Sequence, residues 1–359
     1  MRRMKKVVIV GGGVIGLFCA VRLRQGGAQV TLLEAEREHP SVHGPIASAA
    51  AAGMLAPIER EPSPHEKLAL DSYTLWRERR AGAEWADGAR FDGVAVVSAS
   101  AEEAAAFQRR AERLGASATL LTGGQFRKRT GLEAKVEHAV FVDKEGVADP
   151  LRVLTGLAMQ ARAMGVLIEY ETDVASVTGT SVLTHDQRAY EADVVVLAPG
   201  AWATEKLMAA APALKQVRPA KGQLVSVALE RPLGVTVRSG SFYMAQRRQD
   251  VVLGSTMEFD RYDRVVDPAR SEELLAAAEA LLPGEVKPEG RAWAGIRPMS
   301  PDGWPMIGPS GDGVLVAAGH SRNGWLLAPI TAEIITAHVF GAETPPEWAA
   351  LSPARFGAP

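Results

Sequence analysis

Arg297 is the residue whose type and setting first raise a chemical question. It lies in the stretch GIRPMSPDGWPMIG, residues 295–308, between Ile296 and Pro298. A planar guanidinium can form two parallel hydrogen bonds with a carboxylate. Two partners are available for it: a nearby acid such as Asp302, in a structural ion pair, or the carboxylate of a bound small molecule. The residues alone leave both roles open.

A glycine pattern near the amino terminus predicts a dinucleotide site. In VVIVGGGVIG, Gly11, Gly13 and Gly16 form GxGxxG directly after a short apolar run. The first glycine allows a tight turn, the second lets the backbone approach a pyrophosphate, and the third lets helix and strand pack closely. The phosphates would lie at the helix N-terminus, where free N–H groups and the helix dipole favour an anion.

Glu34 narrows the choice of dinucleotide. It ends the next predicted strand, where a carboxylate can accept from both ribose hydroxyls and would repel a 2′-phosphate. NADP is therefore disfavoured, whereas NAD and FAD both remain. DVVVLAPGAW, residues 193–202, is a strand ending in a glycine turn and resembles a second nucleotide-side motif of flavoproteins. In GHSRNGWLLAP, residues 319–329, a turn precedes a helix, so the backbone of residues 322–324 can direct N–H groups at an anion.

The elements around these motifs predict alternating strands and helices. Strand Lys5–Val10, helix Val14–Gln25 and strand Ala28–Leu33 make a βαβ unit, which requires a parallel sheet. Near the carboxyl end, strand Val314–Ala318 and helix Gly324–Phe340 repeat the pattern. The sequence therefore predicts an α/β domain of the Rossmann type.

Capping signals place three further helices. A polar residue followed by proline at 63–64 and at 149–150 predicts helices that end near residue 81 and at residue 164. Ser271 is expected to cap a third helix, SEELLAAAEALL. The basic cluster Arg77–Arg80 is expected to be a solvated helix face.

The remaining segments predict a second domain that consists mostly of antiparallel strands. Residues 91–142 combine short strand-like runs with a charged helix at Glu102–Leu114, and residues 217–262 alternate as antiparallel strands with one packed face do. Three other runs are expected to return to the first sheet: Val166–Tyr170, Asp173–Thr178 and Asp193–Ala198. The fold class predicted is α/β, a Rossmann-like domain interleaved with a mostly antiparallel α+β domain.

Composition excludes several classes of protein. Lys and Arg number 40 against 42 Asp and Glu, a formal charge of −2, which disfavours nucleic acid and anionic lipid as partners. No run reaches the roughly eighteen apolar residues of a membrane helix. The single cysteine, Cys19, excludes an internal disulfide and a cysteine-based metal cluster, and it fits a reducing cytoplasm. MRRMKK and the apolar run after it mimic a secretory signal, but the three glycines favour a strand, turn and helix.

Four segments carry a resemblance to a known family. AAGMLAP (51–57), RPAKGQ (218–223), GIRPMSPDGWPMIG (295–308) and GHSRNGWLLAPIT (319–331) resemble the D-amino-acid oxidase superfamily of FAD enzymes. The resemblance is strongest to its glycine oxidase branch, which is associated with thiamine biosynthesis, and extends from the first strand to about residue 340. It implies non-covalent FAD that is stretched across the first domain, with the isoalloxazine ring at the domain boundary.

The resemblance also implies domain bounds and cofactor contacts. The FAD-binding domain would comprise residues 1–85, 145–212 and 292–359, and the substrate domain residues 86–144 and 213–291. Besides the three GxGxxG glycines and Glu34, the residues implied to bind FAD are Val14, Ile15, Ala35, Ala47, Ser48, Ala52, Gly53, Met54, Val174, Gly200, His320, Ser321, Arg322, Asn323, Gly324, Trp325 and Leu326. No metal site is expected. His320 is expected to be a turn residue rather than an acid or base, and Trp202, Trp304 and Trp325 to serve packing.

In the family, an arginine that matches Arg297 binds the substrate carboxylate, assisted by a tyrosine that matches Tyr243 and an arginine that matches Arg322. The implied reaction is hydride transfer from the α-carbon of a small amino acid to the flavin. Hydrolysis of the imine then gives a 2-oxo acid and ammonia, and molecular oxygen reoxidises the flavin to give hydrogen peroxide. Orientation by the carboxylate clamp would supply much of the rate, and no side chain need act as a base.

Some positions depart from the family pattern and leave alternatives open. Ser241 stands where a histidine is common, Gln246 replaces a proline, and Trp325 replaces an aliphatic residue. The substrate could therefore be glycine, sarcosine, a small D-amino acid or a bulkier amine. The alternatives are a dehydrogenase that passes electrons to a quinone or a partner subunit, a silent flavin-binding subunit, and an NAD dehydrogenase. A homo-oligomer is possible.

Overall fold

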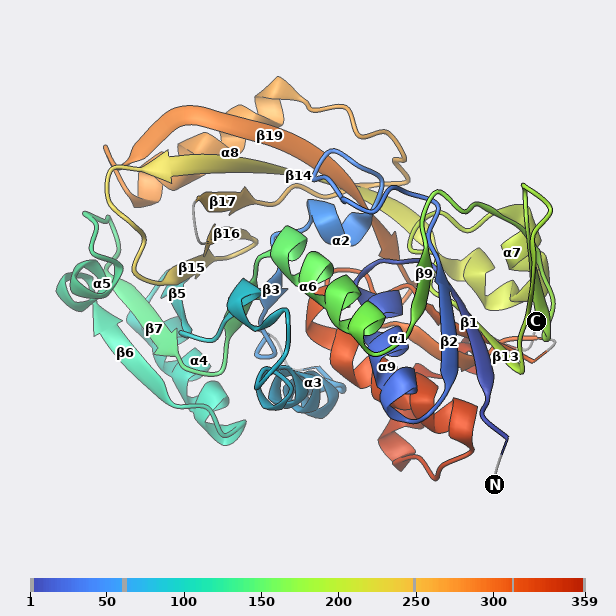
Figure 1. The fold of residues 1–359 in the computed structure, drawn as a ribbon. Coiled ribbons are helices and arrows are strands. Elements are labelled where there is room, and N and C mark those ends of the chain that lie inside the picture. Colours follow the sequence, from blue (N-terminus) through green and yellow to red (C-terminus); the bar gives the residue numbers. More distant parts are fainter. Residues whose placement is uncertain (1–2, 60–62, 248–249, 312, 358–359) are drawn as a thin grey trace.

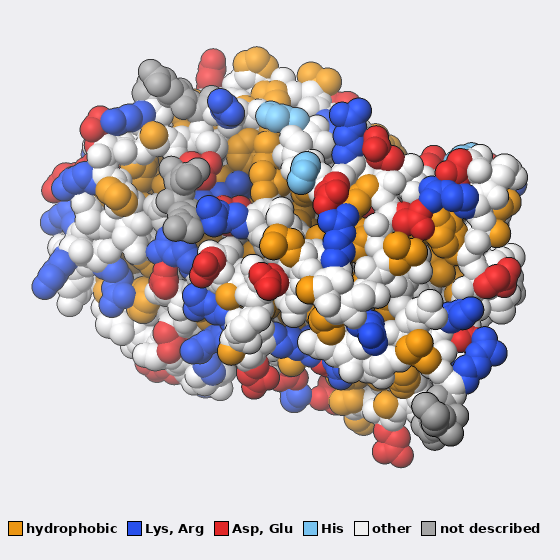
Figure 2. Space-filling model, viewed as in Figure 1, with side chains coloured by type: hydrophobic (Ala, Val, Ile, Leu, Met, Phe, Trp, Pro, Cys, Tyr) orange, Lys and Arg blue, Asp and Glu red, His pale blue; other side chains and the backbone are white. Residues whose placement is uncertain are grey.

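The structure, a computed structural model, describes residues 3–59, 63–247, 250–311 and 313–357. Two large sheets organise the fold, with four helices gathered beside the smaller sheet (Figure 1). They are α1 (Val14–Gln25), α9 (Gly324–Phe340), α6 (Pro150–Ala163) and α3 (Glu66–Glu78). In the described part of the chain no helix is both long and apolar enough to cross a membrane. Figure 2 shows basic and acidic side chains intermixed over one face of the molecule, in keeping with the nearly balanced charge.

The first sheet carries the dinucleotide motif. Its six strands are parallel except for the pairing of β20 with β21. Runs such as VVIV and VVVL fit this position because a parallel sheet is covered on both faces and favours β-branched residues. In spatial order the strands are β20 (Met306–Pro309), β21 (Val314–Ala318), β13 (Val194–Leu197), β1 (Lys6–Val10), β2 (Gln29–Leu33) and β9 (Leu167–Glu169).

Helices cover one face of this sheet and a small sheet covers the other. The helical face shares one hydrophobic core among α1 (Val14–Gln25), α9 (Gly324–Phe340), α3 (Glu66–Glu78) and α6 (Pro150–Ala163). A second core on the opposite face unites the parallel strands with α7 (Glu205–Ala210) and a three-stranded antiparallel sheet. The strands of that sheet are β10 (Val174–Val177), β11 (Ser181–Thr184) and β12 (Ala189–Glu191).

The second large sheet is mostly antiparallel and has nine strands. Its longest strands, β14 (Arg218–Leu229) and β19 (Val286–Met299), pair over most of their length and arch over the top of the view (Figure 1). Helices α8 (Pro268–Leu281), α5 (Gly123–Thr130) and α4 (Ala101–Arg113) pack on it. The other strands are β18 (Glu258–Phe259), β17 (Val251–Gly254), β16 (Phe242–Gln246), β15 (Thr236–Ser239), β5 (Val94–Ser98), β7 (His138–Val142) and β6 (Ala118–Thr122).

Short elements lie between the two large sheets and at the chain's end. The short helix α2 (Ala47–Ala50) packs against β19, so it contacts the antiparallel sheet. The remaining elements are strands β3 (Met54–Leu55), β8 (Gly146–Ala148) and β4 (Ala89–Arg90), and 3₁₀ helices at Ala86–Gly88, Pro212–Gln216, Pro346–Leu351 and Pro353–Phe356.

Most predicted elements are confirmed, and the errors have local causes. The first βαβ unit and the carboxyl-terminal strand and helix agree within a residue, and Asp149 caps α6 by accepting from the Arg152 N–H. Ser63 was wrong as a cap: α3 begins three residues later, and the Ser63 hydroxyl accepts instead from the His65 N–H. That helix ends at residue 78 rather than near 81.

Three further expectations were wrong. Asp267, not Ser271, caps α8, and its side chain accepts from the Ala269 N–H at 2.9 Å. Residues 173–178 do not join the parallel sheet, because β10 turns back to pair antiparallel with β11. Arg79, expected to be solvated, is partly buried and forms an ion pair with Glu333 of α9.

The predicted domain bounds remain a prediction. The expected boundary at residue 292 falls inside β19, a single strand that pairs with β14 on both sides of that position. Arg297 therefore belongs, by its pairing, to the antiparallel sheet.

Candidate functional site

The turn after β1 is built for close backbone approach. Gly11 has φ 109°, and a β-carbon there would overlap the carbonyl oxygen of Ala198. A β-carbon at Gly16 would overlap the carbonyl oxygen of Gly11. These contacts leave no space for side chains, so the turn brings the N-terminus of α1 against the end of the parallel sheet. The geometry is the one that a dinucleotide pyrophosphate requires.

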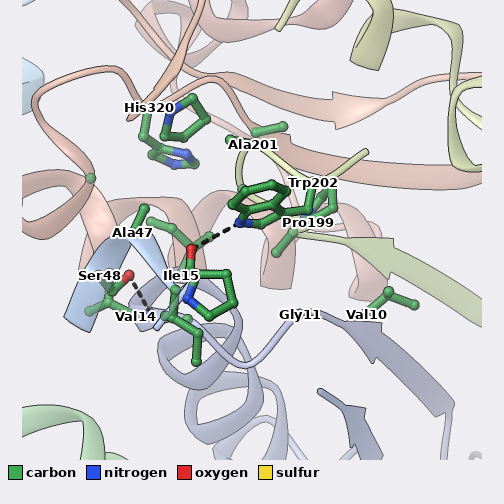
Figure 3. A pocket seen from close by; sticks show the side chains of 18 of the residues that line it. Val10, Gly11, Val14, Ile15, Ala47, Ser48, Pro199, Ala201, Trp202 and His320 are labelled. Carbon is green, nitrogen blue, oxygen red and sulfur yellow. Dashed lines mark hydrogen bonds between the residues drawn. The ribbon is translucent and has the colours of Figure 1, made fainter. Parts of the chain in front are cut away.

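A cavity of about 390 Å³ opens beside this turn. Figure 3 shows Val14 and Ile15 from α1, Ala47 and Ser48 from α2, and His320 around it. The cap residue of α1, Gly13, offers no side-chain bond, and the described residues supply a partner for the Val14 N–H alone, the Ser48 hydroxyl at 3.1 Å. The other N–H groups of the first turn have no partner within the helix and are available to an anion.

Glu34 lies at the end of β2 in the wall of this cavity. Its carboxylate accepts hydrogen bonds from the backbone N–H groups of Gly12 and Glu36. Burial raises the pKa of Glu34, and the two backbone donors oppose that shift. The carboxylate is therefore held in place by the glycine turn, where it can accept from ribose hydroxyls.

The predicted cofactor residues divide into three groups. Those that line the first cavity are Gly11, Gly13, Val14, Ile15, Glu34, Ala35, Ala47, Ser48, Val174, Gly200, His320, Ser321, Arg322, Gly324 and Trp325. Ala52, Gly53, Met54 and Asn323 line a second cavity instead. Gly16 and Leu326 line neither, because Gly16 packs against the turn and Leu326 lies in the core of the helical face.

Other residues of the first cavity were not predicted. Pro45, Ile46 and Trp202 line it, and the Trp202 indole N–H donates to the Pro45 carbonyl oxygen at 2.9 Å (Figure 3). Trp202 therefore joins the turn after β13 to the loop before α2. The sequence signal was the glycine turn at 200, but the loop that it meets lies far away along the chain.

The second cavity, of about 730 Å³, meets the first at a shared wall. Its floor is the antiparallel sheet, and one side is the turn before α9. The residues that line both cavities are Ala47, Ala51, Arg297, Ser321, Arg322 and Trp325. A molecule in the first cavity can therefore contact a molecule in the second at this junction.

Arg297 is the notable side chain at the junction. Its guanidinium donates to the Thr256 carbonyl oxygen at 3.1 Å and lies 3.9 Å from the Met257 sulfur. Burial and the charge of Arg322 lower its pKa, while Tyr243 acts in the opposite direction. Among the residues the structure describes, no acid lies within ion-pair distance of it. The partner proposed from sequence, Asp302, binds Arg355 instead, at 2.8 Å.

Two other cations of this sheet are paired, whereas the buried Arg247, just after β16, donates to the Ala51 carbonyl oxygen at 2.8 Å and lines neither cavity. Arg238 forms an ion pair with the fully buried Glu145 at 2.9 Å, and Lys221 binds Asp263 at 2.8 Å. Because a partly buried cation without an acid is unfavourable, Arg297 differs from them in a way that favours an external anion. The alternative of a structural ion pair is therefore not supported by this geometry.

Tyr243 lies on the same sheet face as Arg297, on β16. Burial raises its pKa, and the nearby Arg297 charge and a hydrogen bond with Ser255 oppose that shift. The phenol is thus protonated at neutral pH and can donate to an anion bound by Arg297. Arg322, exposed in the turn before α9, lines both cavities beside them.

His320 is buried and neutral. Its Nε2 is 3.0 Å from the Thr331 hydroxyl oxygen, and that hydroxyl donates to the Leu327 carbonyl oxygen at 2.8 Å. The threonine oxygen must therefore accept, which places the imidazole proton on Nε2. Burial lowers the pKa of His320 to about 3. This arrangement suits a structural residue at the cavity wall and not a proton donor at neutral pH.

The tryptophans and the cysteine serve the core in part. Trp325 stacks on Trp76 with ring centroids 6.2 Å apart and also lines both cavities, so its role exceeds packing. Trp304 lines the second cavity and contacts the His65 ring edge-on.

Cys19 is fully buried in α1, as expected. In the described ranges no three His, Cys, Asp or Glu side chains gather as a metal site.

The first cavity begins at a dinucleotide turn and meets a second, substrate-sized cavity at Arg297, which has no acidic partner among the described residues. This arrangement suits a dinucleotide-dependent oxidoreductase. Residues 6–338 match the family described as FAD dependent oxidoreductase, and the chain belongs to this family. FAD is therefore the cofactor, and the alternative of an NAD dehydrogenase is excluded. The glycine turn, the free N-terminus of α1 and the wall residues fit it.

Named relatives agree with this assignment. A glycine oxidase of Geobacillus kaustophilus is 31% identical, over 94% of this chain and 93% of that protein. A bifunctional protein ThiO/ThiG of Synechocystis sp. is 31% identical over 99% of this chain, which spans only 55% of that protein. The crystal structure of the Geobacillus glycine oxidase superposes with a TM-score of 0.82, covering 98% of this chain and 99% of that one. These matches confirm the fold class and the family expected from the sequence.

Proposed function

We propose that this FAD-dependent oxidoreductase oxidises the α-amine of glycine or of another small amino acid or secondary amine. The observation that carries the proposal is Arg297, a partly buried guanidinium that has no acidic partner among the described residues and lies where the two cavities meet. A free amino acid supplies the carboxylate that this cation lacks. The similarity to glycine oxidases supports the same substrate class.

Arg297, Tyr243 and Arg322 are the proposed substrate-binding and catalytic residues. Arg297 would hold the substrate carboxylate through parallel N–H bonds, and the Tyr243 hydroxyl would donate to it from the sheet floor. Arg322 lines both cavities from the turn before α9. Three groups that converge on one end of a small molecule fix its orientation, which can supply several kcal/mol towards lowering the barrier.

The same residues favour the reactive form of the amine. Two guanidiniums beside one carboxylate leave a local excess of positive charge. That excess disfavours the ammonium form and lowers the amine pKa, so a larger fraction of bound substrate carries a free electron pair on nitrogen. The chemistry that FAD supplies when bound is two-electron oxidation of the carbon–nitrogen bond. Hydrolysis of the resulting imine would release a 2-oxo acid and ammonia, or an amine from a secondary amine.

Oxygen as the electron acceptor, with hydrogen peroxide as product, is part of the proposal. The competing possibility is a dehydrogenase that delivers electrons to a quinone or a partner subunit, and fold relatives of this chain include a protein titled L-proline dehydrogenase, 22% identical. Such a likeness concerns the fold alone. The amount of peroxide formed per amine oxidised separates the two.

One experiment tests the proposal. The purified protein is examined for a flavin spectrum, then mixed with glycine, sarcosine and both alanine enantiomers, without air for bleaching of the yellow absorbance and in air for peroxide. Bleaching by one or more of them with stoichiometric peroxide is the expected result. Bleaching without peroxide would show that the protein is a dehydrogenase and not an oxidase. No bleaching by any of these amines would contradict the proposal and favour a flavin-binding subunit without this activity.

A further inference from the structure

Three glycines lie together on the sheet face that carries Arg297 and Tyr243. Gly222 of β14 is directly opposite Gly295 of β19, and Gly254 of β17 is directly opposite Tyr243 of β16. Residues directly opposite in antiparallel strands point to the same face, as do residues two apart along one strand. We call these three positions the glycine floor. Gly222 and Gly295 line the second cavity beside Arg297 and Tyr243.

Backbone conformation does not explain the glycine floor. None of the three glycines has a positive φ, and at Gly222 and Gly295 the main chain is open to any residue. Glycine in a strand interior lowers stability by roughly 0.5–1 kcal/mol relative to alanine, and it often marks a close approach to the backbone. The missing side chain itself is therefore the property that the site uses.

The neighbours of the missing β-carbons are the substrate-binding groups. A β-carbon at Gly222 would overlap the guanidinium of Arg297, and one at Gly254 would overlap the phenol of Tyr243, with Cε2 at 2.7 Å. One at Gly295 would stand 2.6 Å from the Ala50 β-carbon of α2. Arg297 and Tyr243 thus lie flat on bare backbone, each directly above a glycine on a neighbouring strand.

We propose that Gly222 and Gly254 are positioning residues that set the height and tilt of the carboxylate-binding groups. The guanidinium rests on the Gly222 peptide while donating sideways to the Thr256 carbonyl oxygen, so its free N–H groups face the cavity. A side chain at position 222 would lift this plane and break that bond. The inference rests on the proposed function, because it assigns the clamp to a substrate carboxylate.

Gly222→Ala is the direct test. The variant should keep its FAD content and melting temperature, since alanine costs a strand less conformational entropy than glycine. Its affinity for a simple carboxylate such as acetate, read from the change in the flavin spectrum, should fall about tenfold, and kcat/KM for the best amine by at least as much. Gly124→Ala, at an exposed helical glycine with no atom nearer than 4.0 Å, is the matched control and should behave as wild type.

A double-mutant cycle distinguishes positioning from a general defect. If Gly222 acts only through the guanidinium, then Gly222→Ala should have no further effect on acetate affinity in an Arg297→Ala background. Additive losses in the two backgrounds would overturn the proposal, as would a Gly222→Ala protein with wild-type acetate affinity, because the long side chain would then have moved aside freely.

Gly254→Ala keeps the proposal testable if position 222 does not tolerate a side chain. It should weaken acetate binding only when Tyr243 is present, and not in a Tyr243→Phe background in which the hydroxyl is already missing. The outcomes are separable from those of the proposed function. Acetate binding reports the clamp even if no amine is oxidised, and an amine oxidase that loses activity on Arg297→Ala but not on Gly222→Ala refutes the glycine floor alone.

Discussion

At the scale of single residues, the site is defined by a charge that has no countercharge among the described residues. Arg238 and Lys221, two other cations of the same sheet, each have a carboxylate at 2.9 Å or less. Arg297 lies on the same sheet, and within the described ranges its guanidinium contacts a carbonyl oxygen and a sulfur atom but no acid. The sequence could place Arg297 in a motif but could not exclude Asp302 as its partner. That exclusion required Arg355, which reaches Asp302 from the chain's end.

Arg297→Ala should lose most activity while keeping the flavin. Removal of the guanidinium leaves the substrate carboxylate without its countercharge in a partly dry cavity, which costs about 2–5 kcal/mol of transition-state binding. The measurement is kcat/KM for the best amine, with FAD content read from the visible spectrum. Retention of wild-type KM and kcat would remove Arg297 from the substrate site.

Tyr243→Phe should cost less than the arginine change. The ring still covers Gly254, and one hydrogen bond to a charged group is lost, about 1–2 kcal/mol. Steady-state kinetics on each accepted amine measure it. Since every substrate shares the carboxylate, the loss should be nearly the same for glycine and for larger amines. A loss confined to one amine would instead place Tyr243 against the substrate side chain.

At the scale of elements, sequence patterns predicted the turns, caps and helices that depend on neighbouring residues, and they missed the pairing of strands that are distant in the sequence. The glycine turn, the Asp149 cap and helix α9 follow from signals within a few residues, and all three were placed correctly. Asp267 with Pro268 carries the same signal as Asp149 with Pro150, so the cap of α8 was available and overlooked. The Gly222–Gly295 pairing joins strands distant in sequence, and no local pattern reveals it.

Trp202 illustrates an element-scale contact with a measurable consequence. Its indole N–H closes one side of the cofactor cavity by holding the loop at Pro45 (Figure 3). Its ring packs on Tyr262 with centroids 5.9 Å apart. Trp202→Phe retains a ring and removes the bond. Since the side chain is 40% exposed, the loss should be near the low end of 0.5–1.5 kcal/mol, a roughly two- to fivefold weaker affinity for FAD.

The recovery of flavin fluorescence after dilution measures this effect as a dissociation rate. Trp348→Phe is a matched control, because Trp348 packs on the helical core away from both cavities. An unchanged dissociation rate for Trp202→Phe would show that the loop is held by its other contacts, such as the bond from Arg264 to the His43 carbonyl oxygen.

At the scale of the whole molecule, two sheets of different kinds meet around one short helix. The parallel sheet provides the dinucleotide turn, the antiparallel sheet provides a flat floor with a fixed cation, and α2 lies between them. Each sheet alone carries half of the site. The wall of the cofactor cavity also includes His320, a buried histidine whose pKa is lowered to about 3 by burial.

Stability should fall in acid because His320 resists protonation. Its pKa is about 3 in the native state and near 6.5 when unfolded, so between these values the unfolded chain binds the extra proton. Stability attributable to this residue is complete above pH 6.5 and declines as the pH falls, by about 2 kcal/mol at pH 5. His65 and His338 also have pKa values lowered by burial, so the stability curve of the wild type alone would combine the effects of three histidines.

His320→Gln can keep a donor for Thr331 and cannot titrate. The difference between the urea midpoints of wild type and this variant, followed from pH 7.5 to 4.5, isolates the contribution. A difference that stays constant over this range would mean that His320 accepts a proton in the native state, and the assigned Nε2 tautomer would no longer account for its role.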